Sequence, residues 1–379
     1  MSRPFSYQSF KAIVQYMDPN ERLKVSQCCP EFHRIDKIVP FKINVLKIES
    51  NKTIMNQCSY QMGIYRKYPE GVEIPMNHEI ENIRGGTHVD IDENDVAYSH
   101  REMVKGDIWF QDFAETDFFI DGPRLDVFWS HFSNERKPLP KFRRMIQLTV
   151  SNQKEKQVRL FEYSRHLYTH ANRLLSLIFR GRKEVHIKLL DLEGAHNSMI
   201  HVIPGLKFRI KGINLGYLNP KSLDSLVLTE PVEVVQTNHS NFFHPLIQNA
   251  MKLVISGWRD VNEEGTSIAR LPNQWIHISP IYVSRESLLE FITLIIREWR
   301  LAGRRLGTQL SAGVPVTSEI PQVLRRLGEE FNGEFLPDRS IKIPLCHSTN
   351  VHISVSKSES GPRLTKAHVL IPTLEMKII

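Results

Sequence analysis

Cysteine is scarce in this chain of 379 residues, and its four copies show no Cys-x-x-Cys spacing. Two of them, Cys28 and Cys29, are adjacent, which is a poor geometry for a disulfide bond. The pattern argues against both a disulfide framework and a zinc ribbon. We therefore expect a protein of a reducing compartment, cytoplasmic or nuclear.

Long apolar runs are also missing. The chain does not start with a basic segment followed by an apolar stretch, so no secretory signal is expected. The longest apolar stretch within a predicted helix, around 291–296, falls far short of the roughly twenty residues that span a membrane. The sequence predicts a protein with no membrane segment.

The common catalytic and nucleotide-binding motifs are absent. There is no Gly-x-Ser-x-Gly elbow, no phosphate-binding Gly-rich loop, and no His-Glu-x-x-His zinc motif among the sixteen histidines. A hydrolase or transferase would need a site assembled from distant segments. We therefore expect no enzyme activity, no cofactor and no resident metal.

One acidic stretch resembles the start of a calcium loop, with oxygen ligands at Asp90, Asp92 and Asn94. The sixth position of that loop should be Gly and the twelfth Glu, because the Gly makes the turn and the Glu binds calcium through two oxygens. Asp95 and Arg101 occupy these positions. The sequence therefore argues against calcium binding here.

The formal net charge of +7 is mild for this length. Arginines gather near the end of the predicted helix 284–300, where the helix dipole favours cations. A second basic patch, Lys141, Arg143 and Arg144, surrounds Phe142. No nucleic-acid recognition motif accompanies either patch, so a solvated basic surface is the favoured interpretation.

The N-terminal stretch carries the strongest pattern that is present. Phe10, Val14 and Met17 share one helical face with Ile13. Asp18-Pro19 then suits the N-cap and first position of a second helix, which Pro30 is expected to end. A unit of about thirty residues buries too little surface to be stable alone. It must therefore pack on other parts of the chain, on a partner, or on both.

This stretch resembles an F-box, the segment that joins a protein to the Skp adaptor of an SCF ubiquitin ligase. Tyr16 to Pro19 matches the aromatic-Leu-Asp-Pro turn of that family, and Ser26 and Cys29 match its Ser and Cys. Arg22 stands where the family usually has Leu. The resemblance implies that the adaptor-binding residues are Phe5, Val14, Met17, Pro19, Leu23 and Phe32.

The stretch that follows alternates apolar and polar residues, which predicts strands over 41–50, 53–56 and 59–68. Its landmarks resemble a nematode family that pairs an F-box-like segment with an associated domain of unknown function. They include Gly63-Ile64-Tyr65-Arg66, Gly85-Gly86 and Asp90-Ile91-Asp92, and the later run 171–194 is similar. Short aromatic strands are expected at 108–110, 118–120 and 127–129, and a linker at 134–140.

The second half predicts a helix within 158–180 and then a strand about every twenty residues. The expected strands are 184–190, 206–215, 223–228, 251–255 and 274–278. This period is typical of a leucine-rich-repeat-like stack of αβ units, and a non-repeating α/β sheet is the alternative. Further helices are expected over 284–300 and within 316–335, and strands over 351–355, 368–371 and the C-terminus.

The sequence thus predicts a mixed α+β or α/β chain with three parts. These are F-box-like helices (1–38), a small β-rich associated domain (39–140), and an irregular leucine-rich-repeat-like αβ stack with a β cap (141–379). The implied function is that of a substrate-recognition adaptor of an SCF-type ubiquitin ligase. Its partners would be a Skp-type adaptor with its cullin complex and an unknown protein substrate. The alternative is a stand-alone protein-interaction module that has lost ligase coupling.

Overall fold

The computed structural model describes most of the chain. The described residues are 7–49, 51–98, 103–110, 140–195, 198–238, 242–256, 261–279, 285–314, 319–346, 348–356 and 373–379. Contacts divide the chain into two compact units, one formed by residues 1–210 and 221–230 and the other by 211–220 and 231–379. Helices and strands occur in both units, which confirms a mixed α+β chain.

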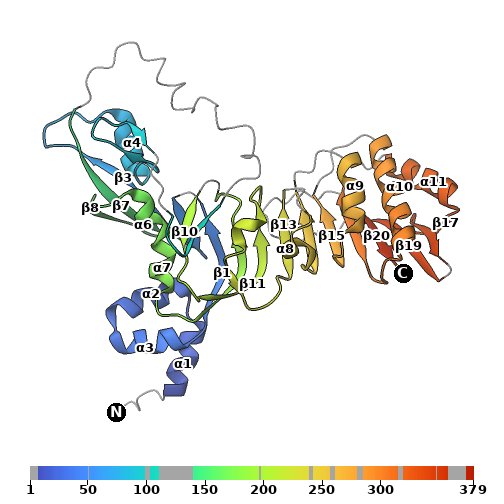
Figure 1. Cartoon of the computed structure of the whole chain (residues 1–379), viewed down its shortest axis with the longest axis horizontal. Helices are drawn as coiled ribbons and strands as arrows, with labels where there is room; N and C mark the ends of the chain where they lie inside the picture. The colour runs from blue at the N-terminus through green and yellow to red at the C-terminus, as the bar shows by residue number, and fades with distance from the viewer. Residues whose placement is uncertain are drawn as a thin grey trace, which may run out of the picture. The chain divides into compact units, whose positions relative to one another are not determined.

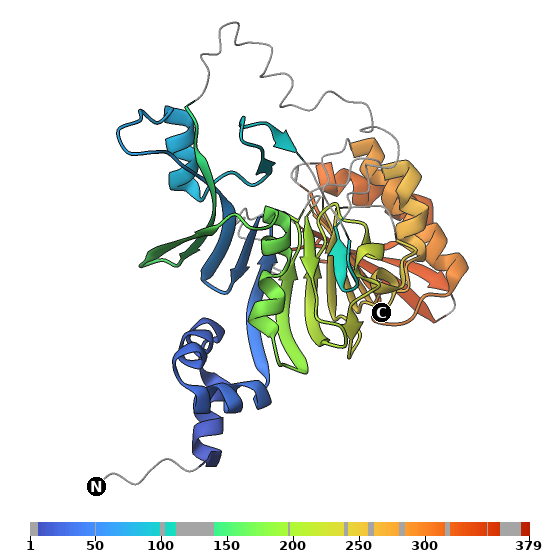
Figure 2. The ribbon, with the colours of Figure 1, turned by 60° about the vertical axis from the view of Figure 1, so that its left-hand side comes forward.

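Unit 1 begins with three short helices, α1 (Tyr7–Tyr16), α2 (Pro19–Cys28) and α3 (Pro30–Ile38). Asp18 caps α2 as predicted, since its side chain accepts a hydrogen bond from the Asn20 N–H at 2.8 Å. Pro30 ends α2, but it also occupies the first position of α3, a helix that the sequence reading missed. Proline suits that position because its missing N–H would have no partner there. Figure 2 shows the three helices, in blue, next to the first residues of strand β1.

The sheet of unit 1 has an antiparallel part and a parallel part. Strands β1 (Phe41–Ile48), β2 (Lys52–Met55), β3 (Cys58–Lys67), β7 (Arg143–Ser151) and β8 (Lys156–Glu162) pair antiparallel in that order. On its other edge β1 pairs parallel with β9 (Glu184–Asp191), and β11 (Lys207–Asn214) and β12 (Val227–Leu228) follow. The strands predicted over 41–50, 53–56 and 59–68 are confirmed.

Smaller elements complete unit 1. They are α4 (Met76–Arg84), the pair β4 (Asp90–Ile91) and β5 (Ala97–Tyr98), the pair β6 (Asp107–Trp109) and β10 (Met199–His201), α6 (Leu167–Asn172) and α7 (Leu174–Phe179). The helix predicted within 158–180 is partly wrong. Its first residues form strand β8, which pairs along its length with β7, and the helices begin only at Leu167.

Unit 2 is a sheet covered by helices. The last residues of β11 pair parallel with β13 (Val234–Thr237), and β14 (Lys252–Ile255), β15 (Trp275–Ile278) and β16 (Gln309–Gly313) continue in parallel. The antiparallel strands β20 (Thr373–Ile378), β19 (Thr349–Ser356), β18 (Ile341–Cys346) and β17 (Glu334–Phe335) then close the sheet. The helices of this unit are α8 (Pro245–Gln248), α9 (Val261–Arg270), α10 (Arg285–Ala302) and α11 (Ile320–Phe331). The short 3-10 helix η2 (Pro220–Leu223) lies at the boundary, since its residues from Lys221 onward belong to unit 1.

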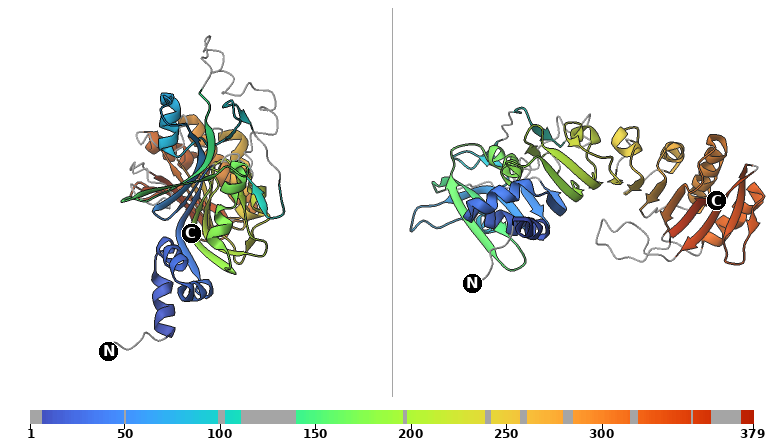
Figure 3. Two further views of the ribbon diagram at one scale, coloured as in Figure 1. Left: turned by 90° about the vertical axis from the view of Figure 1, so that its left-hand side faces the viewer. Right: turned by 90° about the horizontal axis from the view of Figure 1, so that it is seen from below.

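Helices α9, α10 and α11 lie along one side of the unit 2 strands (Figures 1 and 3). The predicted helix 284–300 is confirmed as α10, and the helix predicted within 316–335 as α11. Their apolar faces are buried as the periodicity indicates, with Phe291, Ile295 and Leu327 no more than 1 % exposed. The core of this unit therefore lies between these helices and one face of the sheet.

The strand predicted over 223–228 is wrong in position. The start of this segment is the 3-10 turn η2, and only the two residues of β12 are extended. The strand that joins the parallel row of unit 2 is instead β13, in the next apolar stretch. The expected strands at 118–120, 127–129 and 368–371, and nearly all of the linker at 134–140, lie outside the described residues.

Candidate partner-binding site at the N-terminal helices

The three N-terminal helices share a small apolar core of their own. Val14, Phe32 and Val39 are at most 3 % exposed, and the rings of Phe10 and Phe32 meet edge to face with centroids 5.7 Å apart. Aromatic pairs prefer this arrangement because the positive ring edge faces the negative ring face. Partly buried apolar side chains surround this core, namely Phe10, Met17, Val25, Cys29 and Ile35.

The six residues predicted to bind an adaptor fall into three groups. Val14 and Phe32 belong to the core of the helices, and Pro19 is also buried. Met17 and Leu23 are partly exposed. Phe5 lies outside the described residues. Of the five that the structure describes, only Met17 and Leu23 are thus placed so that a partner could touch them directly.

Polar side chains at the start of α2 attach the helices to the β2–β3 hairpin. The Asn20 amide donates to the Met55 carbonyl at 3.0 Å and accepts from the Tyr60 hydroxyl at 2.9 Å. Asn56, in a left-handed conformation, donates to Asp18 at 2.9 Å. Burial raises the pKa of Tyr60, so its hydroxyl stays a donor. The Asp-Pro turn therefore faces its own chain.

A buried charge cluster holds the other side of α2. Arg22 donates to the Asp36 carboxylate at 2.7 Å, and Arg182 donates to the other carboxylate oxygen at 2.5 Å. The two guanidinium groups also bind main-chain carbonyls of α3 and the residues after it. Both lie against the ring of Phe41, at 5.1 and 3.8 Å from its centre. One carboxylate thus joins α2, α3 and the turn after α7.

Sequence reasoning missed this cluster. The sequence places Arg22 at a position that is usually apolar in the family it resembles, and no local pattern distinguishes Asp36 or Arg182. The signal was present, because a lone Arg inside an apolar helix position needs a buried carboxylate partner. Asp36 lies on the inner side of α3, but nothing in the sequence links either residue to Arg182, which is 146 positions from Asp36.

The opposite side of the helices carries exposed apolar side chains. Ile13 and Tyr16, one helical turn apart on α1, are 44 % and 85 % exposed. Tyr7 and Ile38 are also exposed, at 53 % and 61 %, but Tyr7 lies two turns from Val14 on the same face of α1 and Ile38 ends α3. We call Ile13 and Tyr16 the outer pair. Large apolar side chains gathered on one short helix are typical of a surface that binds another protein.

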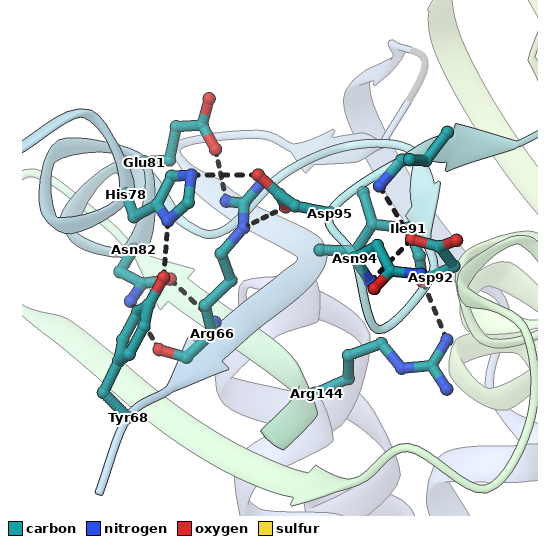
Figure 4. A network of polar contacts seen from close by, with 11 residues as sticks. Arg66, Tyr68, His78, Glu81, Asn82, Ile91, Asp92, Asn94, Asp95 and Arg144 are labelled. Atoms are coloured by element: carbon teal, nitrogen blue, oxygen red, sulfur yellow. Dashed lines mark hydrogen bonds and ion pairs between the residues drawn. The ribbon is translucent and has the colours of Figure 1, made fainter. Parts of the chain in front are cut away.

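A second polar network lies in unit 1, between β3 and α4 (Figure 4). His78 contacts the Tyr68 hydroxyl at 2.6 Å and the Asp95 carboxylate at 2.9 Å. Arg66 binds the same carboxylate at 2.6 Å and reaches Glu81 at 2.5 Å. A Tyr-His-Asp series can move protons in an active site. Here His78 is 2 % and Tyr68 9 % exposed, and the network fastens α4 to the sheet.

The stretch that resembles a calcium loop is a turn. One Asp92 carboxylate oxygen accepts from the N–H groups of Asn94 and Val96, both at 2.8 Å. Asp95 adopts the left-handed conformation, with φ 65°, and its carboxylate serves Arg66 and His78. These oxygens are therefore engaged within the protein. Among the described residues, no group of His, Cys, Asp or Glu side chains is arranged to hold a metal ion.

Comparison with known proteins identifies one domain. Residues 166–315 match the model of a family described as Domain of unknown function (DUF3557). The domain spans helices α6 and α7 of unit 1 and the parallel strands through β16. No curated protein and no solved structure matches the chain. No helix in the described parts of the chain is long and apolar enough to cross a membrane.

Proposed function

We propose that this protein is a substrate-recognition adaptor of an SCF-type ubiquitin ligase. Helices α1–α3 would bind a Skp-type adaptor with its cullin complex, and other parts of the chain would bind a protein substrate. The observation that carries the proposal is the two-sided character of the helices. Their inner side is fixed by Asn20 and Arg22, while the outer pair on α1 faces away from their shared core.

Two further observations support the proposal. The Asp18-Pro19 turn and the short helices on either side of it follow the F-box-like pattern of the sequence. In unit 2, strands β13 to β16 succeed one another in parallel, as in an irregular leucine-rich-repeat-like stack. Such a stack offers a broad surface to a substrate, because it leaves one side of its strands free of the covering helices.

The test is capture of a purified Skp-type adaptor by the full chain. The double variant Ile13→Asp/Tyr16→Asp should abolish capture, because it places two charges in an apolar contact. The matched control, Gln8→Asp/Gln15→Asp, adds the same two charges on a different side of α1 and should bind normally. A substitution of Val14 would not discriminate, since Val14 is fully buried and its loss would disrupt the helices themselves.

Point variants are preferable to removal of the N-terminal helices, because removal would leave Arg182 buried without Asp36. We expect the unaltered chain and the control to capture the adaptor, and the Ile13/Tyr16 variant not to capture it. Failure of the unaltered chain to capture the adaptor would overturn the proposal. Equal capture by all three proteins would show that the outer pair is not the contact.

The alternative is a stand-alone interaction module without ligase coupling. The sequence favours it at one point, because Phe5-Ser6 stands where the F-box family has Leu-Pro. Under this alternative the chain would retain its substrate but capture no adaptor. Co-purification of bound proteins from cells, with and without the Ile13/Tyr16 substitutions, distinguishes the two. Only the ligase adaptor would lose a set of partners through these substitutions.

A further inference from the structure

The sheet of unit 2 aligns three lysines across neighbouring strands. Register pairs place the following residues directly opposite one another on β14, β15, β16, β20, β19 and β18: Lys252, Trp275, Gln309, Lys377, His352 and Lys342. Residues that oppose each other in a sheet project from the same face. We call this set the lysine row.

The lysine row lies on the face that the helices leave uncovered. Its immediate strand neighbours point the other way and are 0–2 % exposed: Leu253, Ile276, Leu310, Met376, Ile353 and Ile341. A Cβ added at Gly328 or Gly333, in and just after α11, would meet the Ile341 side chain, which places α11 on that buried face. Because successive side chains alternate, the lysine row points away from α11. Figure 3 (right) shows the helices of this unit on one side of its strands.

The charges of the row are not balanced within it. Lys252 and Lys377 are exposed, and among the described residues no ion pair within 4.0 Å involves any of the three lysines. Lys252 lies 5.7 Å from the centre of the Trp275 ring, which stacks on His277. Two carboxylates lie close by. Glu375, on the adjacent row, accepts from the Ser356 hydroxyl at 2.6 Å, and Glu334 opposes Lys342 at the end of the row.

The spacing of the lysines fits an extended peptide. Neighbouring strands are about 4.8 Å apart, so Lys252 and Lys377 are separated by roughly 14 Å and Lys377 and Lys342 by roughly 10 Å. An extended chain advances about 3.3 Å per residue, so carboxylates three or four residues apart would match these separations. Trp275 would add a flat apolar contact between the first two lysines.

We infer that the lysine row binds an extended acidic segment of a partner protein, which crosses the strands of unit 2. A nucleic acid fits less well, because Glu375 and Glu334 would repel a continuous line of phosphates, whereas a peptide can place its carboxylates between them. The inference rests on the proposed function, since it names the chemistry of the substrate that the adaptor would carry.

The probe is a fluorescein-labelled peptide of about ten residues, with three glutamates spaced four and three residues apart and glycine at the other positions, long enough to cross the row. Its binding to the full chain is followed by fluorescence anisotropy. Lys252→Glu/Lys377→Glu should weaken binding about tenfold or more, since it replaces two attractions by two repulsions. The matched control, Lys42→Glu/Lys188→Glu, reverses two exposed strand lysines of unit 1 and should change binding less than about twofold.

Three results would overturn the inference. The first is that the peptide fails to bind the full chain. The second is that the control substitutions weaken peptide binding as strongly as those in the lysine row. The third is that a single-stranded oligonucleotide of equal charge binds more tightly than the peptide and depends equally on Lys252 and Lys377. Capture of the Skp-type adaptor by the same proteins keeps the two proposals apart. Peptide binding without adaptor capture overturns only the proposed function, and adaptor capture without peptide binding overturns only the inference.

Discussion

The guanidinium of Arg22 lies 2.7 Å from the carboxylate of Asp36, and the two side chains are 1 % and 0 % exposed. Arg182 binds the second oxygen of the same carboxylate, so the cluster has two cations and one anion. Buried charges are costly unless they are paired and hydrogen-bonded. Here Arg22 donates four hydrogen bonds and Arg182 two to oxygens of α3 and the residues after it, while the buried Nε of Arg182 has no hydrogen-bond partner among the described residues. The N-terminal helices are thus fastened to unit 1 by charge as well as by apolar contact.

Replacing Arg22 by Leu tests this attachment. The F-box-like pattern favours Leu at this position, so a purely apolar helix pair would gain from the change. The structure predicts a loss of about 1–3 kcal/mol in the free energy of unfolding, because the carbonyl groups of Val39 and Pro40 would lose their Arg22 donors while Asp36 stays paired with the second cation. Urea unfolding followed by circular dichroism measures the loss. Lys24→Ala is the control, since the exposed pair of Lys24 with Glu21 should contribute less than about 1 kcal/mol.

The network around His78 predicts acid sensitivity. Burial, together with the charge of Arg66, lowers the pKa of His78 from its usual 6.5 despite the nearby Asp95. The folded protein therefore prefers neutral His78, and its contribution to stability is complete above pH 6.5 and is lost as the pH falls below that value.

Melting temperatures measured between about pH 7.5 and pH 5 test this expectation. His78→Gln should reduce the difference in melting temperature across this range, because Gln does not titrate. His33→Gln, at an exposed position beside Ser26, should leave the difference unchanged. If the two substitutions change the difference in melting temperature equally, His78 is not the source of the acid sensitivity. Part of the difference should remain in both variants, because burial also lowers the pKa values of His170 and His277.

Gly63 is predicted to tolerate no side chain. A Cβ at this position would overlap the carbonyl oxygen of Gly85, where the double glycine after α4 lets Thr87 pair with Ile64. Gly63→Ala should lower the free energy of unfolding by roughly 2–3 kcal/mol, since the displaced groups are main chain. In Gly194→Ala the atoms nearest to the new methyl group belong to the flexible side chain of Glu49, so its effect should stay within about 0.5 kcal/mol. Calorimetric unfolding of both variants provides the comparison.

The end of α10 offers a matched pair of substitutions. Trp299 is 1 % exposed, whereas Leu301, two residues later on the same helix, is 82 % exposed. Trp299→Ala should cost about 3–5 kcal/mol because it leaves a large cavity. Leu301→Ala should cost less than about 0.5 kcal/mol. The free energy of unfolding in urea measures both losses. Similar losses for the two variants would contradict the burial of Trp299 and the exposure of Leu301.

Periodicity alone was sufficient for several elements. Helix α10 has buried apolar residues along one face over about three turns, and strand β1 largely alternates, so their existence and approximate bounds followed from the sequence. Apolar periodicity did not predict strand β8, because its seven residues are all exposed and are held in a strand by pairing with β7. No local pattern records such pairing, because it depends on a neighbour that is brought alongside by the fold.

The candidate site shows the same division. The Asp18-Pro19 turn and the apolar spacing of α1 could be predicted from the sequence, because both are local features with known physical meaning. The sequence did not say which apolar residues face inward. Val14 and Phe32 were expected at an interface and lie in the core, whereas Ile13 and Tyr16 are exposed.

By itself the sequence determined helices α1, α2, α10 and α11, the strands β1 to β3 and most of the parallel strands of the second half, since these depend on propensity and spacing along the chain. The tertiary structure alone decided that Arg22 is a buried anchor, because its charge is balanced by Asp36 and shared with Arg182, far away in sequence. It also decided that three lysines from separate strands form one row. Both depend on contacts between segments that are far apart in the sequence. A pattern along the chain does not show which of these segments the fold brings together.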